Sequence, residues 1–535
     1  MPVLTAIDVL GVQRFIFSSN RLRDVVTGSH LVHWSTSLDG ALGKLAERGD
    51  IIFAGGGNAV IQFDTLGKAH DFTARYTRLL YDEAPGLEVA VVHKEFQSGK
   101  LARALREVQI EMARRKTERT PSVPLLGLSV TASCQETALP TMGFDAAEPT
   151  VALCKGILKR RERKEAANAH WRLYLERTGK PEFSPEEFDF PLELDDLGRT
   201  IGDTSLIGIV HIDGNGVGQR IKTWLEGQEE EQEKKADGDV AVCNGYQEWS
   251  KAIDDLGQKA FQAVVNRVCQ RVEQGDRDGK RILCITGSPF GLGFEMKRVD
   301  GKWMLPLRPI LLGGDDITFV CDGRIALDLA ETALAVFDAS NVPHLGKITA
   351  CAGVAIVRVH APFARAYELA ERVCACAKTM LKEKGLSGCA LDWHIGSVRP
   401  GEALSEIRAR QYHADGHRLT CRPYLLGDGV KEPETWRWLS RELLDNPDVG
   451  LRGKRWSKRR NKVKALAEVI REGPKGVQSA LKTWRVVDPR LSLPQAIENG
   501  FFEASGTPLL DALELLDLHL VLEAGSTDQG KDVVS

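Results

Sequence analysis

The chain has 535 residues, of which 43% are hydrophobic and 27% charged, and its formal net charge is −3. These values are ordinary for a globular protein with a large buried core, and they exclude a disordered or strongly basic chain. No apolar run approaches the ~18 residues that a membrane span needs, and the first residues lack the basic region of a signal peptide. We therefore expect a cytoplasmic protein of roughly two to four domains.

The first unit, residues 1–135, combines apolar strand patterns with helical periodicity. Strand, helix, hairpin, helix, strand is the order of a ferredoxin-like split βαβ domain, and we predict that fold here. The expected elements are a strand (Leu4 to Val9), a helix from Gln13, two strands around a tight turn (Asp50 to Phe63), a helix (Ala69 to Tyr81), a strand (Leu87 to Val92) and a helix (Gly99 to Lys116).

Residues 136–200 carry two charged stretches. The basic stretch, Lys155 to Lys164, predicts a solvated helix. The acidic stretch, Glu182 to Asp196, contains prolines and predicts a linker. We expect this segment to connect two domains.

The second unit, residues 201–400, repeats the order of the first, which indicates a duplicated domain. Its polar run from Glu226 to Asp239 has no counterpart in the first unit and predicts a mobile surface insertion. The expected elements are a strand (Ile207 to Ile212), a helix from Val217, two strands around a tight turn (Pro309 to Val320), a helix (Ile325 to Ala339), a strand (Ile348 to Val357) and a helix (Phe363 to Leu381).

The last segment, residues 401–535, shows no strand pattern. We expect a small all-helical domain with a disordered tail after Gly525. The expected helices are Trp436 to Leu444, Val463 to Arg471, Val477 to Trp484 and Leu509 to Glu523.

Three acidic residues of the second unit occupy the positions that a two-metal phosphoryl-transfer site needs. Asp213 ends the first strand, and Asp315 and Asp316 lie in the turn between the next two strands. In polymerase-like palm domains these places lie side by side at one end of the sheet and hold two divalent ions. A Gly-Asp turn alone is usually only a turn, but the acid at the strand end favours metal ligation.

Small residues and one lysine surround these acids. Gly313 and Gly314 let the turn bend sharply and leave room for a base or ribose. Lys378, on the last helix of the unit, is placed to reach a triphosphate, although a surface lysine near a helix end gives the same pattern. A phosphate cradle at a helix N-terminus is indicated by the residues that follow Asp213, namely Gly214, Asn215, Gly216, Val217 and Gly218.

The first unit keeps Asp8 at the matching strand end, but its turn has lost both carboxylates. One aspartate holds two metals poorly, so this copy is not expected to be catalytic. Its glycines fit nucleotide binding without chemistry, and they equally fit a hairpin kept for packing. The turn residues are Gly55, Gly56, Gly57 and Asn58.

These motifs resemble the large polymerase/cyclase subunit of type III CRISPR effector complexes, over roughly residues 1–500. In that family two palm domains pack face to face, and the active palm joins ATP molecules into cyclic oligoadenylates that switch on effector nucleases. The matching stretches are Asp8 to Phe17, Gly28 to Ser29, Ala54 to Asn58, His211 to Gly218, Arg308 to Asp316, Cys351 to Lys378 and Arg422 to Tyr424.

The resemblance implies roles for these residues. Asp213 and Asp315 would be ligands of two Mg²⁺ or Mn²⁺ ions, with Asp316 as their partner, and ATP would be the substrate. Gly214 to Gly218 and Lys378 would contact the triphosphate. The acceptor nucleotide would lie against Ser29, Gly55, Gly56, Gly57 and Asn58.

The sequence departs from the family in two places. Many members have an N-terminal HD nuclease domain, whereas here the first palm comes first, so we expect a form without it. Many also have a zinc site between the palms, whereas here only Cys134 and Cys154 stand in that region, so we expect the site to be lost. Guide or target RNA and other CRISPR effector subunits are the implied partners.

Two alternative functions and one further surface stay open. A GGDEF-like cyclic dinucleotide synthase shares the palm and metal layout, but here Ile317 follows the Gly-Gly-Asp-Asp turn. A non-catalytic palm-pair scaffold has no need of three neighbouring carboxylates, whose repulsion costs stability. The basic run Gly453 to Lys464 is typical either of a solvated helix face or of an RNA surface on which Trp456 stacks.

Overall fold

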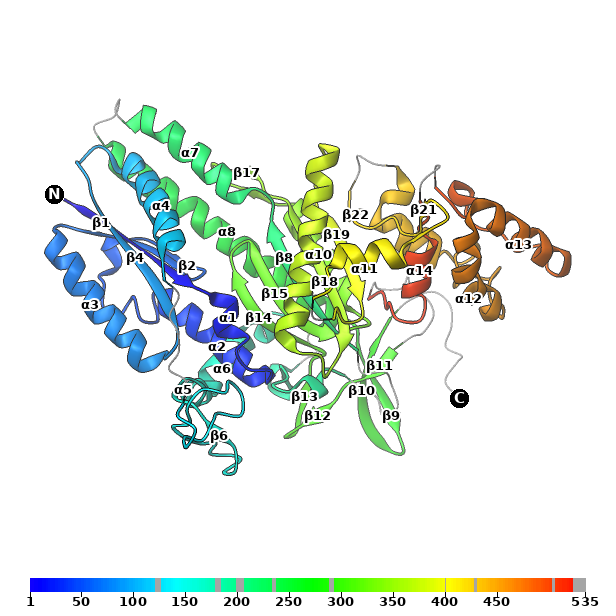
Figure 1. Cartoon of the computed structure of the whole chain (residues 1–535), viewed down its shortest axis with the longest axis horizontal. Coiled ribbons are helices and arrows are strands. Elements are labelled where there is room, and N and C mark those ends of the chain that lie inside the picture. Colours follow the sequence, from blue (N-terminus) through cyan, green and yellow to red (C-terminus); the bar gives the residue numbers. More distant parts are fainter. Residues whose placement is uncertain are drawn as a thin grey trace.

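The computed structural model describes residues 1–120, 127–178, 184–198, 206–232, 237–287, 293–399, 401–427, 431–502 and 506–522. It shows an elongated molecule with the N-terminal unit at one end, the second unit in the middle and the C-terminal helices at the other end (Figure 1). The tail expected after Gly525 lies outside the described residues. No helix within the described ranges is long and apolar enough to cross a membrane.

The N-terminal unit is built on an antiparallel four-stranded sheet of order β2-β3-β1-β4. Apolar positions spaced three and four residues apart give α3 one buried face, at Ala69, Phe72, Tyr76 and Leu80. The elements follow the predicted order: β1 (Val3–Leu10), α1 (Val12–Ile16), α2 (Leu22–Thr36), a 3₁₀ turn (Arg48–Asp50), β2 (Ile51–Gly55), β3 (Asn58–Phe63), α3 (Leu66–Glu83), β4 (Glu88–Glu95) and α4 (Leu101–Glu118).

The middle unit is built on a six-stranded sheet of order β14-β15-β8-β18-β19-β22. Its first four strands repeat the antiparallel order of the N-terminal sheet, while β19 adds to β18 in parallel and β22 adds to β19. The strands are β8 (Leu206–Gly214), β14 (Leu307–Gly313), β15 (Asp316–Asp322), β18 (Ala350–Arg358), β19 (Ala390–Ile395) and β22 (Tyr424–Leu425). The expectation of no strand after residue 401 is therefore wrong, since β22 closes this sheet.

The helices of the middle unit join it to the N-terminal unit. They are α7 (Val217–Gln232), α8 (Gly238–Cys269), α9 (Ala326–Asp338) and α10 (Phe363–Lys384). Helices α9 and α10 pack against β18, whereas α7 and α8 both pack against α4. In the polar run predicted as a mobile insertion, the buried Gln232 accepts a hydrogen bond from the Ala102 backbone amide at 3.0 Å, and Asp239 accepts one from Leu101. The described part of that run is thus an interface; residues 233–236 lie outside the description.

The segment between the two units is also more embedded than expected. Arg160, in the stretch predicted as a solvated helix, is only 4% exposed, and Arg161 forms an ion pair with the buried Asp24 at 2.8 Å. In the predicted linker Phe188 and Phe190 are buried. The elements are β5 (Gly143–Phe144), β6 (Ala152–Leu153), α5 (Lys155–Glu162), α6 (Lys164–Glu176), β7 (Phe188–Asp189) and 3₁₀ turns at Pro185–Glu187 and Leu194–Asp196.

Smaller elements that no sequence pattern predicted complete the middle unit. One small sheet consists of β12, β13 and β7. A second small sheet, β11-β10-β9, projects from the molecule (Figure 1). They are β9 (Val272–Arg277), β10 (Lys280–Thr286), β11 (Gly293–Glu295), β12 (Arg298–Val299), β13 (Lys302–Met304), β16 (Asn341–Val342) and β17 (Gly346–Lys347).

The C-terminal segment is mainly helical and packs on the edge of the six-stranded sheet. Trp393 of β19 stacks on Tyr424 and meets Trp436 edge to face, with ring centres 5.6 and 5.7 Å away. The elements are α11 (Leu404–Gln411), β20 (His413–Ala414), β21 (His417–Arg418), α12 (Arg460–Val469), α13 (Gly473–Val487), α14 (Leu509–Leu515), a π-helical turn (Trp438–Leu444) and 3₁₀ turns at Glu432–Glu434, Ile470–Glu472 and Gln495–Ile497.

A buried ion pair fastens α14 to the sheet and gives a stability prediction. Asp511, fully buried, accepts hydrogen bonds from Arg422 Nε at 2.7 Å and Tyr424 Oη at 2.6 Å. Asp511→Ala removes one carboxylate partner of the buried Arg422. We therefore expect a loss of about 3–5 kcal/mol in the free energy of unfolding, measured by urea denaturation. Asp448→Ala, which removes an exposed partner of Arg455, should leave the unfolding midpoint unchanged.

Candidate active site

The three predicted carboxylates meet at one end of the six-stranded sheet. Asp213 lies near the end of β8, and Asp316 begins β15. The register pairs Ile212 with Ile317, so Asp213 and Asp316 are the next cross-strand neighbours. Asp315 lies over the Gly214 backbone: a methyl group added there would sit 2.6 Å from Asp315 Oδ2. Glycine at 214 is therefore what admits the Asp315 carboxylate to this position.

The electrostatics of this corner are those of crowded negative charge. Burial and the neighbouring Asp213 raise the pKa of Asp315 to about 6. Burial, followed by Asp213 and Asp315, raises the pKa of Asp316 well above its ordinary value. Asp316 Oδ1 is buried without a hydrogen-bond partner, although the side chain as a whole is 37% exposed. Carboxylates with raised pKa values and an unpartnered oxygen fit a site that a cation completes.

Lys378 brings a positive charge to this corner. Its Nζ donates to Asp213 Oδ2 at 2.5 Å and to the Gly214 carbonyl at 2.8 Å. In the described part of the chain no three His, Cys, Asp or Glu side chains are arranged to enclose a metal ion. The donor types still suit Mg²⁺ or Mn²⁺, because carboxylate oxygens are the ligands that these ions prefer.

The glycine turns of the two units face each other. A methyl group on Gly56 would lie 3.5 Å from the Gly313 carbonyl oxygen, so the N-terminal turn contacts the Gly-Gly-Asp-Asp turn directly. Gly56 and Gly314 have left-handed φ angles of 59° and 78°, which glycine adopts without strain. Gly257 of α8 supports the turn from behind, since its own methyl group would lie 2.0 Å from the Gly314 carbonyl oxygen.

A cavity of about 390 Å³ opens beside the two turns. Ser29, Gly56 and Gly57, three of the residues predicted to hold an acceptor nucleotide, line it together. The predicted residues Gly55 and Asn58 do not, and Asn58 instead donates from Nδ2 to the Gly56 carbonyl at 3.3 Å. Six aromatic or imidazole rings also line it: His30, His33, Trp34, His170, Trp171 and Tyr174.

The loop after Asp213 leads into α7, and one residue of the predicted phosphate cradle is engaged elsewhere. Asn215 cannot contribute its donors to a phosphate, because its amide nitrogen Nδ2 donates to Thr349 Oγ1 at 3.0 Å and its backbone N–H to the Thr349 carbonyl at 2.7 Å. Gly216 takes a left-handed φ of 68°, and α7 begins at Val217. The first turn of this helix, with Val217 and Gly218, provides the amides that a helix interior does not use.

The N-terminal unit repeats the charged pair of the middle unit. Lys116, near the end of α4, forms an ion pair with Asp8 of β1, as Lys378 of α10 does with Asp213 of β8. Asp8 faces Asn58 across the strands, at the place where Asp213 faces Asp316. The duplication therefore conserves the strand-end acid and its lysine but not the acids of the turn.

Two side chains beneath the carboxylates were not predicted. His211, on the same strand face as Asp213, lies 3.4 Å from Asp316 Oδ1 through Nδ1 and hydrogen-bonds Thr318 Oγ1 at 3.2 Å. Burial lowers the pKa of His211, which disfavours the charged form of the ring. The ring of Tyr367, from α10, packs edge to face on His211 with centres 5.5 Å apart. His211 could have been predicted from the sequence, because residues two apart on a strand, such as His211 and Asp213, lie on the same face.

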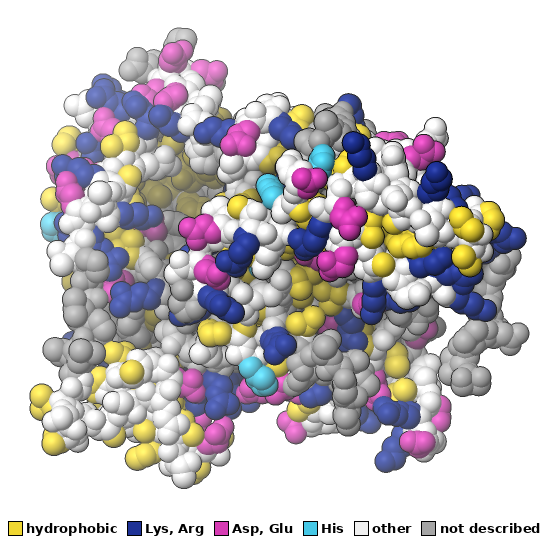
Figure 2. Space-filling model, turned by 45° about the vertical axis from the view of Figure 1, so that its right-hand side comes forward, with side chains coloured by type: hydrophobic (Ala, Val, Ile, Leu, Met, Phe, Trp, Pro, Cys, Tyr) yellow, Lys and Arg dark blue, Asp and Glu magenta, His cyan; other side chains and the backbone are white. Residues whose placement is uncertain are grey.

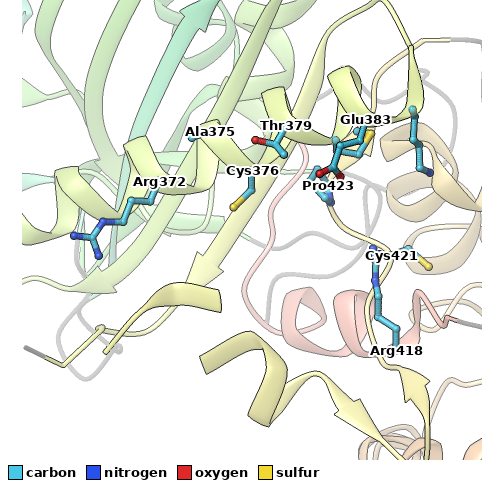
Figure 3. Close-up of a pocket in the computed structure, with 10 residues that line it drawn as sticks. Arg372, Ala375, Cys376, Thr379, Glu383, Arg418, Cys421 and Pro423 are labelled. Carbon is cyan, nitrogen blue, oxygen red and sulfur yellow. The ribbon is translucent and has the colours of Figure 1, made fainter. Parts of the chain in front are cut away.

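Other predicted features lie away from this corner. Trp456 is 2% exposed and donates to the Ser492 carbonyl at 3.1 Å, which rules out the alternative in which it stacks on a base. The lysines around it are exposed at positions 454, 458 and 464, and Figure 2 shows Lys and Arg side chains over this C-terminal part of the molecule. A cavity of about 410 Å³ between α10 and the segment around Pro423 contains none of the predicted site residues (Figure 3).

Comparison with known proteins identifies the fold. The sequence matches no protein-family model and no curated protein. A chain of the Csm1–Csm4 cassette in complex with pppApA is similar over 97% of this chain and 69% of its own, with a TM-score of 0.51 and 14% identity. This chain shares that fold. The apo cassette gives the same TM-score, with 97% and 70% covered, and the cassette in complex with cA3 gives 0.50, with 96% and 69% covered; both are 14% identical.

Proposed function

We propose that the protein is a nucleotidyltransferase that converts ATP into a cyclic oligoadenylate in a type III CRISPR-like defence system. The observation that carries this proposal is the meeting of Asp213, Asp315 and Asp316 at one sheet end, opposite the glycine turn of a second copy whose turn has no acid. Two cassettes of the same fold are in complex with pppApA and with cA3. Their ligands support adenylate chemistry here.

The domain division follows from this function. Residues 1–135 would be a degenerate palm domain, 201–400 the catalytic palm domain, 136–200 the connecting segment and 401–535 the C-terminal helical domain. With the turns facing each other, each palm would carry one nucleotide subsite. The two subsites thus lie in one chain, as an internal dimer.

Each residue at the site has a role in this reaction. Asp213, Asp315 and Asp316 would hold two Mg²⁺ or Mn²⁺ ions, which stabilise the charge on the attacking and leaving oxygens when bound. Lys378 and the amides at the start of α7 bind and orient the donor triphosphate. Ser29 with Gly56 and Gly57 positions the acceptor nucleotide. The Gly56–Gly313 contact supports a close approach of the two subsites, which transfer between them requires.

Product analysis tests the proposal. Purified protein is incubated with each nucleoside triphosphate and Mg²⁺ or Mn²⁺, with and without added RNA, and the products are resolved by mass spectrometry. A cyclic adenylate supports the proposal and gives the ring size. A cyclic dinucleotide containing guanine would favour the GGDEF-like alternative. No product, together with no metal-dependent rise of Tm on adding ATP, would favour the scaffold.

Lys378→Met should impair use of ATP without unfolding the protein. The side chain is 30% exposed, so its replacement should not disturb the core. The variant would lose the charge-assisted hydrogen bonds from Lys378 to the triphosphate, which are worth about 1.5–3 kcal/mol each. We expect KM for ATP to rise roughly ten- to hundredfold in steady-state kinetics. Lys116→Met removes the equivalent ion pair, with Asp8, from the N-terminal copy and should leave KM within about twofold. An equal effect of both variants would contradict a specific role for Lys378.

We further propose that the protein works with partner subunits and RNA. The similar chain belongs to a two-protein assembly, the Csm1–Csm4 cassette, which supports a protein partner. The exposed lysines at 454, 458 and 464 would contact a phosphate backbone. Because Trp456 is buried, this surface would bind RNA through its charge and not by base stacking.

A further inference from the structure

A large cavity lies at the junction of the N-terminal unit, the connecting segment and α10. Its volume is about 820 Å³, within the range of small-ligand sites. The walls come from the residues around α1, the start of β4, the N-terminal part of α5 and the start of α10. It contains none of the carboxylates or glycine turns of the candidate active site. The cavity is therefore a separate space in the molecule.

Arg160 is the buried charge of this cavity. It is 4% exposed, its Nη2 donates to the Phe15 carbonyl at 2.6 Å, and its guanidinium lies 4.1 Å from the centre of the Phe15 ring. Its Nε and Nη1 are buried without hydrogen-bond partners. Burial lowers the pKa of Arg160 to about 10. A buried guanidinium with two unused donors is costly unless an anion satisfies it.

The wall of the cavity carries three arginines, Arg14, Arg119 and Arg160, and three glutamates, so its formal charges balance. Each carboxylate on the wall already has an arginine partner, and the pairs are Glu88–Arg119, Glu136–Arg161 and Glu368–Arg372. Arg14 is exposed on the wall, and the described residues give it no ion pair. Arg14 and Arg160 thus remain for an anionic ligand. Phe15, Phe17 and Tyr367 also line the cavity, and such rings provide the flat apolar surface on which bases stack.

The back wall of the cavity touches the candidate active site. Gln13 Nε2 donates to Tyr367 Oη at 3.3 Å and to Glu371 Oε1 at 2.8 Å. Tyr367 in turn packs on His211, which lies 3.4 Å from Asp316. A ligand that displaced Gln13 would therefore alter the support beneath Asp316.

We propose that this cavity binds a phosphate-bearing ligand of nucleotide size through Arg14 and Arg160, and that binding regulates the carboxylate site through Gln13 and Tyr367. The binding part stands on the cavity alone. The regulatory part rests on the proposed function, because it needs a reaction to regulate.

Calorimetric titration with AMP tests the binding. It is done in EDTA, so that metal-dependent binding at the carboxylates is suppressed. We expect AMP to bind wild type, and Arg14→Glu and Arg160→Met to weaken it at least tenfold. Arg75→Glu, a charge reversal of an exposed arginine on α3, should not. Because Arg14 is exposed, the Arg14→Glu variant should fold and test the binding even if Arg160→Met does not fold. No binding to wild type at millimolar AMP, or equal binding by Arg14→Glu, would overturn the proposal.

Two further arms separate the parts of the proposal. Tripolyphosphate binding without AMP binding would overturn the nucleotide assignment. If the protein makes a cyclic adenylate, saturating AMP should change the wild-type rate at least threefold and that of Arg14→Glu by less; equal responses would overturn the regulatory link. If the protein binds AMP but makes no product with any nucleotide, the proposed function fails while the binding site stands.

Discussion

Asp213→Asn, like the double variant Asp315→Ala/Asp316→Ala, should lower the rate of cyclic adenylate formation by roughly 10³-fold or more. Metal ligands of a phosphoryl-transfer site contribute several kcal/mol to the transition state, and each 1.4 kcal/mol is tenfold in rate. The folded state should not suffer, because the raised pKa values of Asp315 and Asp316 show that these carboxylates cost stability when ionised. We therefore expect Tm at neutral pH to stay or rise in the double variant while product formation disappears.

The N-terminal copy provides the matched control. Asp8→Asn removes an acid from the same place in an equivalent strand and breaks an ion pair with an equivalent lysine, Lys116. Rates are measured by single-turnover product formation and Tm by thermal melting in parallel. Asp8→Asn should keep most of the activity. Comparable losses in Asp8→Asn and Asp213→Asn would mean that the two units share the chemistry, and an unaffected Asp213→Asn would remove the two-metal proposal.

A variant that loses activity while its Tm stays or rises would favour an enzyme over a scaffold. Neighbouring carboxylates with raised pKa values are retained against a folding cost, and the copy that lacks the turn acids shows that the fold forms without them. Asn58 stands where Asp316 stands in the second copy, and the strands still pair on either side. The acids are thus dispensable for the hairpin, which supports the proposed catalytic role over the scaffold.

The arrangement of strands and carboxylates could be predicted because both depend on local patterns. Apolar runs such as Ile207 to Ile212 form central strands, and an acid directly after such a run lies at the sheet end whatever the rest of the chain does. Two glycines before Asp315 and Asp316 mark a tight turn in the same way. The repeat of element order then places the two ends in equivalent positions.

What could not be predicted depends on contacts between distant segments. Tyr424–Leu425 is too short for a strand pattern, and only the exposed edge of β19 makes it one. Trp456 stands in a basic run, yet its ring fills the core of the C-terminal helices. Arg160 likewise reads as solvated from its neighbours and is buried by α2 and Phe15. Composition fixes which side chains are charged, but not which of them a neighbouring element covers.

Gly257 is the clearest case of such a contact, and its replacement tests how much the turn geometry matters. In Gly257→Ala the new methyl group would lie 2.0 Å from the Gly314 carbonyl oxygen, a clash between backbones that only movement of α8 or of the Gly-Gly-Asp-Asp turn relieves. Displacing a catalytic group by about 1 Å can cost roughly 10²-fold in rate. We expect kcat to fall by about that factor, and Tm to fall because the contact is buried.

Gly227→Ala is the matched control for this prediction. Gly227 also lies in a helix, α7, but nothing stands within 4 Å of its methyl position. Alanine there should raise the stability of the helix slightly, by about 0.5–1 kcal/mol, with kcat unchanged. Activity of Gly257→Ala within threefold of wild type, at a folded Tm, would show that the turn tolerates displacement. The carboxylates would then be positioned by the bound ions and not by α8, and the rigid support inferred from the Gly257–Gly314 contact would be wrong.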